Sequence, residues 1–257
     1  MIDTHCHLTY DGLIERVDAV IAAAHAAGVE RMISVGTSPD DARQAVALAE
    51  QYDSIFATVG LHPHHAAQWA DLAIVQNAMR QLSKHPRVVA LGEMGLDRHY
   101  PDPPIQTQRA ALAAQLQVAG ESDLPIIIHN RQATVDTLAI LRASRLPPQR
   151  FVFHCFTGEA VELDAILDFG AMVSFTGITT FKNARHLADA AARVPLERMM
   201  IETDSPYLTP EPHRKVRTNE PRYVADVARF IAQQRSIPLE EFVAAMDANA
   251  VRFFRLP

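Results

Sequence analysis

Eight short apolar segments alternate with helix-like segments along almost the whole chain. Segments that are apolar on both faces are typical of strands in a parallel sheet covered by helices. Eight strands with seven intervening helices are the count of a (β/α)8 barrel, whose usual length of roughly 250 residues matches this chain of 257. We therefore expect an α/β fold, a (β/α)8 TIM-like barrel that forms a single domain over residues 1–257. The expected strands cover residues 2–7, 31–35, 55–59, 87–92, 125–129, 150–154, 171–175 and 198–203, and the expected helices cover 12–27, 39–51, 66–84, 104–120, 132–143, 159–168 and 184–193, followed by two more near 221–235 and 239–254.

Polar side chains able to bind a metal stand at the ends of these apolar segments. The first segment carries His5 and His7, and alternate residues of a strand point to the same face. In a parallel barrel the carboxyl ends of all strands meet at one face, where the active site lies. Six side chains are therefore expected together, namely His5, His7, Glu93, His129, His154 and Asp204.

A set of imidazoles and carboxylates of this kind is typical of a divalent-metal centre. Two metal ions about 3.5–4 Å apart need ligands on both sides and a carboxylate between them, and Glu93 is the expected bridge. Water activated by the metal would be the nucleophile, and Asp204 would accept its proton. The ligands suit Zn²⁺, Mn²⁺, Co²⁺ or Fe²⁺, and Mg²⁺ with more water in its shell, so the sequence does not identify the metal.

The chain also resembles a known family, the TatD-type metal-dependent deoxyribonucleases of the amidohydrolase-like superfamily. The resemblance runs nearly from end to end and is carried by the joint order of several motifs. They are Asp3-Thr4-His5-Cys6-His7-Leu8, Gly60-Leu61-His62-Pro63-His64, Gly92-Glu93-Met94-Gly95-Leu96-Asp97, His129-Asn130-Arg131, Phe153-His154-Cys155-Phe156-Thr157-Gly158, Thr180-Phe181-Lys182-Asn183-Ala184, Glu202-Thr203-Asp204-Ser205-Pro206-Tyr207-Leu208 and Asn219-Glu220-Pro221. It implies a TIM-like barrel with one or two divalent metals, the same six ligands, and phosphodiester hydrolysis, often as a 3′→5′ DNA exonuclease. Departures at Thr9, Gln132 and residues 213–221 remove no ligand but lie where substrate is expected.

Further residues near the expected ligands have candidate roles in catalysis and binding. His64 could protonate the leaving oxygen, and His62 could hydrogen-bond a phosphate, although loop packing explains either histidine equally well. Arg131 and Arg217 could bind the nucleic-acid backbone, the alternatives being a structural ion pair for Arg131 and a solvated loop for Arg217. Two acids are expected to orient the ligands from behind, namely Glu202 and Asp97.

Two other function classes stay open. A net charge of −6 argues against a broad basic face for DNA, but not against a phosphodiester whose charge is met by bound metals. The main alternative is a metal-dependent amidohydrolase or esterase that acts on a small molecule or a tRNA-linked substrate. The remaining alternative is a barrel that binds metal without turnover, which the complete ligand set disfavours.

The expected partner and location follow from the same features. DNA is the expected substrate, preferentially single-stranded or at 3′ ends, with no membrane contact and no obligate protein partner. The chain lacks an apolar run of about 18 residues and a basic, then apolar, leader segment. With only two cysteines and no disulfide framework, the cytoplasm is the expected location.

Overall fold

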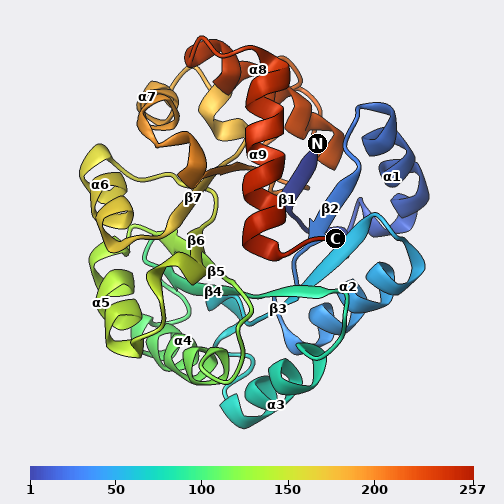
Figure 1. The fold of residues 1–257 in the computed structure, drawn as a ribbon. Coiled ribbons are helices and arrows are strands. Elements are labelled where there is room, and N and C mark those ends of the chain that lie inside the picture. Colours follow the sequence, from blue (N-terminus) through green and yellow to red (C-terminus); the bar gives the residue numbers. More distant parts are fainter. The chain divides into compact units, whose positions relative to one another are not determined.

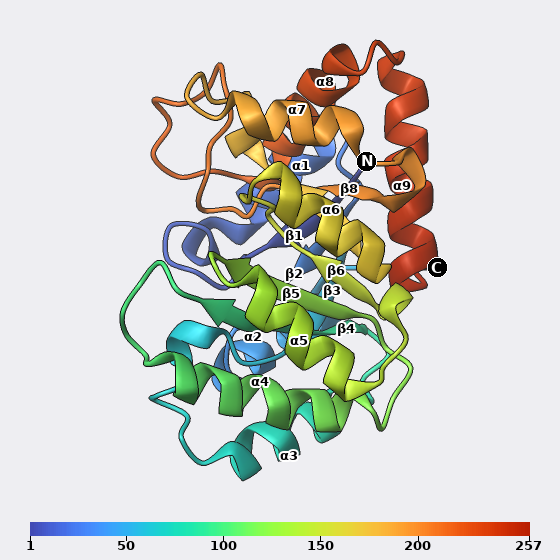
Figure 2. The same cartoon turned by 90° about the vertical axis from the view of Figure 1, so that its left-hand side faces the viewer.

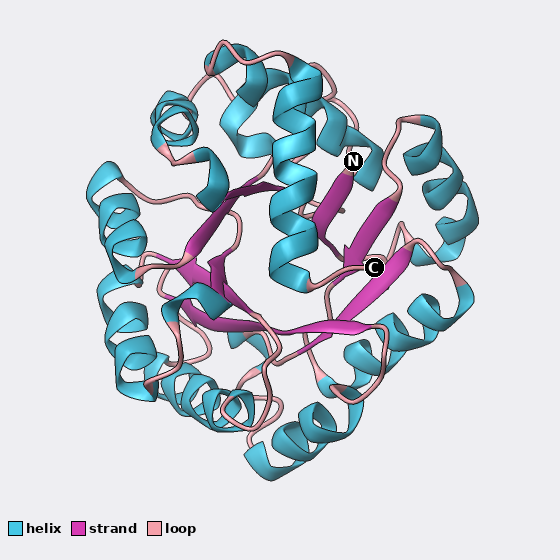
Figure 3. Ribbon diagram, in the orientation of Figure 1, coloured by secondary structure: helices cyan, strands magenta, loops and turns pink.

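Eight parallel strands alternate with helices in the computed structural model, which describes all 257 residues (Figures 1 and 3). The strands follow one another in the sheet in chain order, from β1 to β8. This is the (β/α)8 barrel class that the alternation predicts. None of the helices combines the length and the apolar run that crossing a membrane requires.

The chain divides into two compact units, each assembled from several stretches of sequence. Unit 1 comprises residues 1–34, 155–163 and 173–257, and unit 2 comprises residues 35–154 and 164–172. The expectation of a single domain stays a prediction.

Unit 1 contains the first and last strands of the chain. Its strands are β1 (Ile2–Cys6), β2 (Arg31–Ser34) and β8 (Met199–Ile201), together with most of β7 (Met172–Phe175). β1 pairs with β2 and β7 with β8, both in parallel. Its helices are α1 (Val17–Ala26), α7 (Arg185–Arg193), α8 (Val224–Gln234) and α9 (Leu239–Phe254), and α6 (Ala160–Phe169) divides between the units.

Unit 2 contains four consecutive strands and four helices. The strands β3 (Ile55–Val59), β4 (Val88–Asp97), β5 (Ile126–Arg131) and β6 (Phe151–Phe153) pair in parallel, each with the next. The helices are α2 (Pro39–Gln51), α3 (Leu72–Leu82), α4 (Ile105–Ala119) and α5 (Thr134–Ser144), with α3 beside α4 in both views of Figures 1 and 2. Phe151 and Phe153 are fully buried, and burying a side chain of this kind stabilises the fold by roughly 1.5–3 kcal/mol.

Strand β4 extends further than the sequence predicts, through Glu93 to Asp97. The expected strand ended at Gly92, but Gly92 and Gly95 both have positive φ and lie inside β4. A Cβ on Gly92 would lie 2.5 Å from the carbonyl oxygen of Ile127 on β5. The glycines therefore allow β4 to run close to β5 and to carry two acids, Glu93 within the strand and Asp97 at its end.

Helix boundaries otherwise follow their capping residues. Helix α2 begins and ends where predicted, because Ser38 accepts a hydrogen bond from the Asp41 N–H at 3.2 Å and Pro39 occupies the first helical position. Helix α3 begins at Leu72 rather than at residue 66, because the Asp71 carboxylate caps it by accepting from the Ala73 N–H at 3.1 Å.

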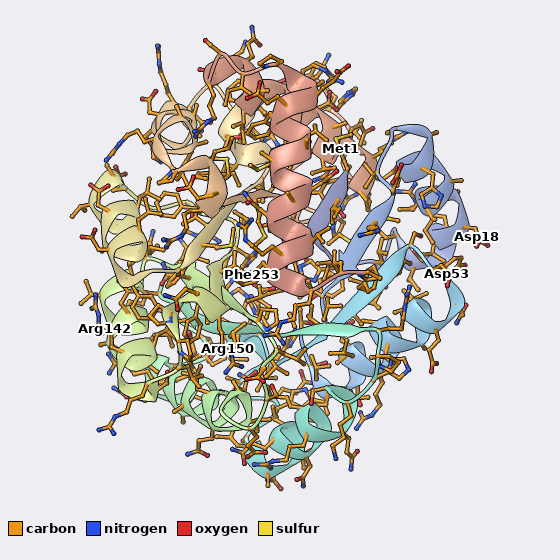
Figure 4. All side chains as sticks on the ribbon, viewed as in Figure 1. Met1, Asp18, Asp53, Arg142, Arg150 and Phe253 are labelled. Carbon is orange, nitrogen blue, oxygen red and sulfur yellow. The ribbon has the colours of Figure 1, made fainter.

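A half-buried arginine in unit 2 joins the end of a helix to the loop before a strand. Arg150, labelled in Figure 4, donates to the carbonyl oxygens of Ala119 at 2.9 Å and Leu124 at 2.7 Å. These carbonyls lie at the end of α4 and in the loop before β5. Carbonyls at a helix end have no partner within the helix. Arg150 therefore secures the connection that precedes β5.

Candidate metal centre

Unit 1 brings His5, His7 and Asp204 together. His7 Nε2 lies 3.2 Å from Asp204 Oδ1, and His5 Nε2 lies 3.8 Å from the same oxygen. The two imidazole centroids are 5.0 Å apart, as expected for alternate residues at the end of one strand. Residues about 200 positions apart in sequence thus present two nitrogens and a carboxylate oxygen to one place.

Backbone pairing places Asp204 beside β1. Its N–H donates to the carbonyl oxygen of His5 at 2.9 Å, and the N–H of His7 donates to the Ser205 carbonyl at 2.8 Å. Asp204 adopts a left-handed conformation with φ 53°, which aspartate tolerates better than most residues. The loop after β8 therefore continues the parallel pairing and aims the carboxylate at the two histidines.

A buried acid that the sequence analysis did not single out holds the same segment. Asp3 accepts hydrogen bonds from the Thr203 N–H at 2.9 Å and the Thr203 hydroxyl at 2.5 Å, and from the His5 N–H at 3.3 Å. Burial raises the pKa of Asp3 to about 8, against the lowering effect of these hydrogen bonds. An acid two residues before His5, within the first expected strand, was the available signal for this role.

Unit 2 brings three histidines around one oxygen of Glu93. Oε1 of Glu93 lies 2.6 Å from His154 Nε2, 2.8 Å from His129 Nδ1 and 3.5 Å from His62 Nε2. Glu93 and His129 lie on neighbouring strands β4 and β5, and His154 directly follows β6. Consecutive parallel strands thus supply one candidate ligand each.

Asp97 stands behind this group. Its Oδ2 accepts from His129 Nε2 at 3.1 Å and from His64 Nε2 at 2.9 Å. Burial opposes ionisation, but the bonds from His129 and His64 outweigh it and hold the pKa of Asp97 well below its usual range. Burial likewise opposes the charged form of His129, but the bonds to Asp97 and Glu93 prevail and raise the pKa of His129. His129 therefore directs Nδ1 toward Glu93 while Asp97 fixes its other nitrogen, as carboxylates do behind metal-binding histidines.

Two buried glutamines of α4 hold the loops that carry these side chains. Gln115 accepts from the Leu61 N–H at 2.7 Å and donates to the Leu61 carbonyl at 3.1 Å, next to His62. Gln108 accepts from the Asp97 N–H at 2.8 Å and donates to the Asp97 carbonyl at 2.9 Å. Helix α4 thereby fixes the backbone at both places.

The donor set fits a divalent cation. In unit 2, one ligand atom from each of His62, Glu93 and His129 lies within 4.8 Å of the other two, and the same holds for His64, Asp97 and His129. Imidazole nitrogens and carboxylate oxygens are ordinary ligands of Zn²⁺, Mn²⁺ and related ions. The carboxylates that favour a proton on His129 would favour a cation as well.

Comparison with known proteins identifies the family. The model of the family described as TatD related DNase matches residues 2–255. The chain belongs to this family. It is 39% identical over 258 residues to the uncharacterized metal-dependent hydrolase YabD of Bacillus subtilis, covering 100% of this chain and 99% of that protein.

Two further comparisons concern a relative named as an exonuclease and a solved structure. The chain is 35% identical to a Klebsiella pneumoniae protein named 3′-5′ ssDNA/RNA exonuclease TatD, covering 99% of this chain and 97% of the other. A solved structure of the TatD homologue YJJV from Escherichia coli K12 has a TM-score of 0.93 and 29% identity, covering 100% of this chain and 98% of that one. As a member of the TatD related DNase family, the chain is a metal-dependent hydrolase with a TIM-barrel fold.

The remaining sequence candidates of this TatD-family chain lie in different settings. His62 faces the Glu93–His129 pair, with Nε2 3.2 Å from His129 Nδ1. Glu202 accepts hydrogen bonds from the Cys155 N–H at 2.8 Å and the Thr4 hydroxyl at 3.3 Å. Arg131 has its guanidinium carbon 5.4 Å from the centre of the Tyr100 ring, while Arg217 is exposed in the loop after β8.

Proposed function

We propose that this chain is a divalent-metal-dependent phosphodiester hydrolase that degrades DNA from the 3′ end, with single-stranded DNA as the preferred substrate. The observation that carries the proposal is the convergence of three imidazoles on one oxygen of Glu93 in unit 2. A relative at 35% identity whose name is 3′-5′ ssDNA/RNA exonuclease supports the substrate class and the polarity.

We propose six metal ligands in two groups. The unit 1 group is His5, His7 and Asp204, and the unit 2 group is Glu93, His129 and His154. One or two ions of Mg²⁺, Mn²⁺ or Zn²⁺ bound there would acidify a water molecule and offset charge on the phosphate.

The proposed catalytic and orienting roles follow from the contacts within each unit. Asp204, with its side chain 15% exposed, is placed to accept a proton from the attacking water. His64 is 35% exposed and fixed through Nε2 by Asp97, which suits proton delivery to the leaving oxygen. Glu93 takes part in catalysis as a ligand. Asp97 orients His129, and Glu202 orients the backbone at Cys155 next to His154.

Substrate contacts are proposed for His62, Arg131 and Arg217. A guanidinium can bind two oxygens of one phosphate. Neither arginine forms an ion pair within the chain, so both are available to an external anion. Cytoplasm is the proposed location, supported by the thiols of Cys6 and Cys155, which persist in a reducing compartment.

The test uses metal-stripped protein with single-stranded DNA labelled at either end. Mg²⁺, Mn²⁺ or Zn²⁺ is added in turn, with a Glu93→Ala variant as the control. We expect a 5′-labelled strand to shorten stepwise and a 3′ label to be released as a mononucleotide, only with metal and only with Glu93 present. Demonstrated metal binding without cleavage under any condition would overturn the nuclease proposal and favour an amide or ester substrate.

A further inference from the structure

The turn after β4 places an exposed aromatic ring beside the unit 2 group. Oδ1 of Asp97 accepts hydrogen bonds from the N–H groups of His99 at 2.8 Å and Tyr100 at 3.2 Å. Since Oδ2 of the same carboxylate holds His64 and His129, one buried acid fixes both this turn and a candidate ligand. The position of Tyr100 is thus tied to those of His64 and His129.

Tyr100 is not a core residue. Its side chain is 48% exposed, although exposed large aromatic rings are few in this protein. The ring meets His64 at 5.1 Å and His99 at 4.8 Å between centroids, both nearly perpendicular to it. These contacts restrain the ring while about half of its surface stays open to solvent, an arrangement that core packing does not require.

A cation without an acidic partner lies next to the ring. Arg98 and Arg109 both pair with Asp136, the latter at 2.6 Å. Arg131, at the end of the neighbouring strand β5, has no such partner, and its guanidinium carbon lies 5.4 Å from the Tyr100 ring centre. The local acid is used by the other two arginines, which leaves Arg131 for an anion.

A restrained open ring beside an unpaired guanidinium matches the two parts of a nucleotide. Every base has a π-face that can stack on an aromatic side chain, and each base is joined to a phosphate that a guanidinium binds. We propose that Tyr100 is a stacking platform for a nucleobase of the single-stranded substrate and that Arg131 binds the phosphate joined to it. This inference rests on the proposed nuclease function and adds a binding subsite to it.

The platform predicts a loss of affinity that depends on the presence of a base. Stacking of one base on an aromatic side chain accounts for roughly tenfold or more in affinity when the ring is removed. Tyr100→Ala should therefore weaken binding of single-stranded DNA about tenfold, whereas Tyr100→Phe, which keeps the ring, should bind like the wild type. On a strand whose 3′-terminal residues are abasic, the Tyr100→Ala and wild-type proteins should bind equally.

The experiment measures binding and turnover separately. Metal-loaded wild type, Tyr100→Ala and Tyr100→Phe are titrated by fluorescence anisotropy with 5′-labelled single-stranded DNA that carries phosphorothioate linkages at its 3′ end to suppress cleavage. Abasic residues are introduced singly at the first three positions from the 3′ end, which locates the stacked base. Thermal melting of each variant checks that the fold is kept, as expected for a change at an exposed residue.

The outcomes separate this inference from the function on which it rests. A tenfold loss for Tyr100→Ala that disappears at one abasic position supports the platform. Equal loss on normal and abasic strands, or no loss, with wild type binding and cleaving DNA, overturns the platform alone. A wild type that neither binds nor cleaves single-stranded DNA overturns the proposed function and the platform with it.

Discussion

The two proposed ligand groups are held in place by different means. In unit 1, His5 lies on β1 and His7 directly follows it, whereas Asp204 comes from a distant loop that backbone hydrogen bonds attach to β1. In unit 2, Glu93, His129 and His154 come from three consecutive strands, β4 to β6, within them or directly after them. Unit 1 thus depends on long-range pairing of a loop, and unit 2 depends on regular sheet geometry.

Each group is supported by a further acid, and the pKa values of these two acids are shifted in opposite directions. Asp3 of unit 1 is bound by a hydroxyl and two backbone N–H groups, and burial raises its pKa to about 8. Asp97 of unit 2 is bound by two imidazoles, which hold its pKa well below the usual range despite burial. Asp3 therefore organises backbone, whereas Asp97 polarises and orients histidines.

The largest effect should follow loss of the carboxylate on which unit 2 converges. Glu93→Gln keeps the size of the side chain but removes the charge that faces three imidazoles. A metal contributes several kcal/mol of transition-state stabilisation, so we expect nuclease activity to fall by roughly 10³-fold. Metal content by mass spectrometry should fall as well, while the exposed control Glu240→Gln should change neither. Full activity in Glu93→Gln would show that unit 2 does not carry the chemistry.

A second measurement should separate Asp97 of unit 2 from Glu202 of unit 1. Asp97→Asn loosens the orientation of His129, and loss of a carboxylate behind a metal-binding histidine typically costs 10–100-fold in metal affinity or activity. Glu202→Gln in unit 1 alters hydrogen bonds to Cys155 and Thr4 instead, so it should cost about 1 kcal/mol in the free energy of unfolding. Metal titration and urea unfolding of both variants test this. Equal metal affinities in the two variants would contradict the distinction.

A third prediction uses the opposite pKa shifts. Because the pKa of Asp3 is raised to about 8 from an unfolded value near 3.8, the folded state retains a proton that the unfolded state loses, and stability should decline as pH rises from about 4 to 8. Asp97, with a lowered pKa, contributes stability above about pH 4 that is lost as the pH falls further. Asp3→Asn should therefore flatten the neutral side of a curve of Tm against pH, and Asp97→Asn the acid side. The measurement uses protein from which metal has been removed by a chelator. Each change of 1 kcal/mol in the free energy of unfolding should shift Tm by about 2–4 °C.

Sequence patterns located most of the fold and placed His5 beside His7, for reasons that are visible in individual residues. The alternation of side chains along β1 was enough to place His5 beside His7, and the Ser38-Pro39 cap fixed the start of α2. The extent of β4 was underestimated because the expected strand stopped at Gly92, and only the closeness of β5 shows why glycines continue the strand there.

Sequence patterns did not show which distant residues hold a side chain. Asp3 was visible as an acid in the first expected strand, but its bonds to Thr203 join positions 200 residues apart. Tyr100 follows a strand in an irregular turn, where no periodicity indicates exposure or direction. The start of α3 depended on whether Asp71 or an earlier residue would cap the helix.

The smallest effect we predict concerns the charges around the unit 2 group. If Arg131 binds one phosphate of a single strand, Arg131→Ala should lower the slope of log affinity against log salt by about 0.7. Arg98→Ala is the matched control, because Arg98 lies one residue beyond the neighbouring strand and pairs with Asp136. It should leave the slope unchanged. Anisotropy titrations of single-stranded DNA over a range of salt concentrations measure both slopes. Equal slopes for the two variants would show that Arg131 does not contact the DNA. If the slope changed only in an Arg217→Ala variant, the phosphate contact would lie in unit 1 instead.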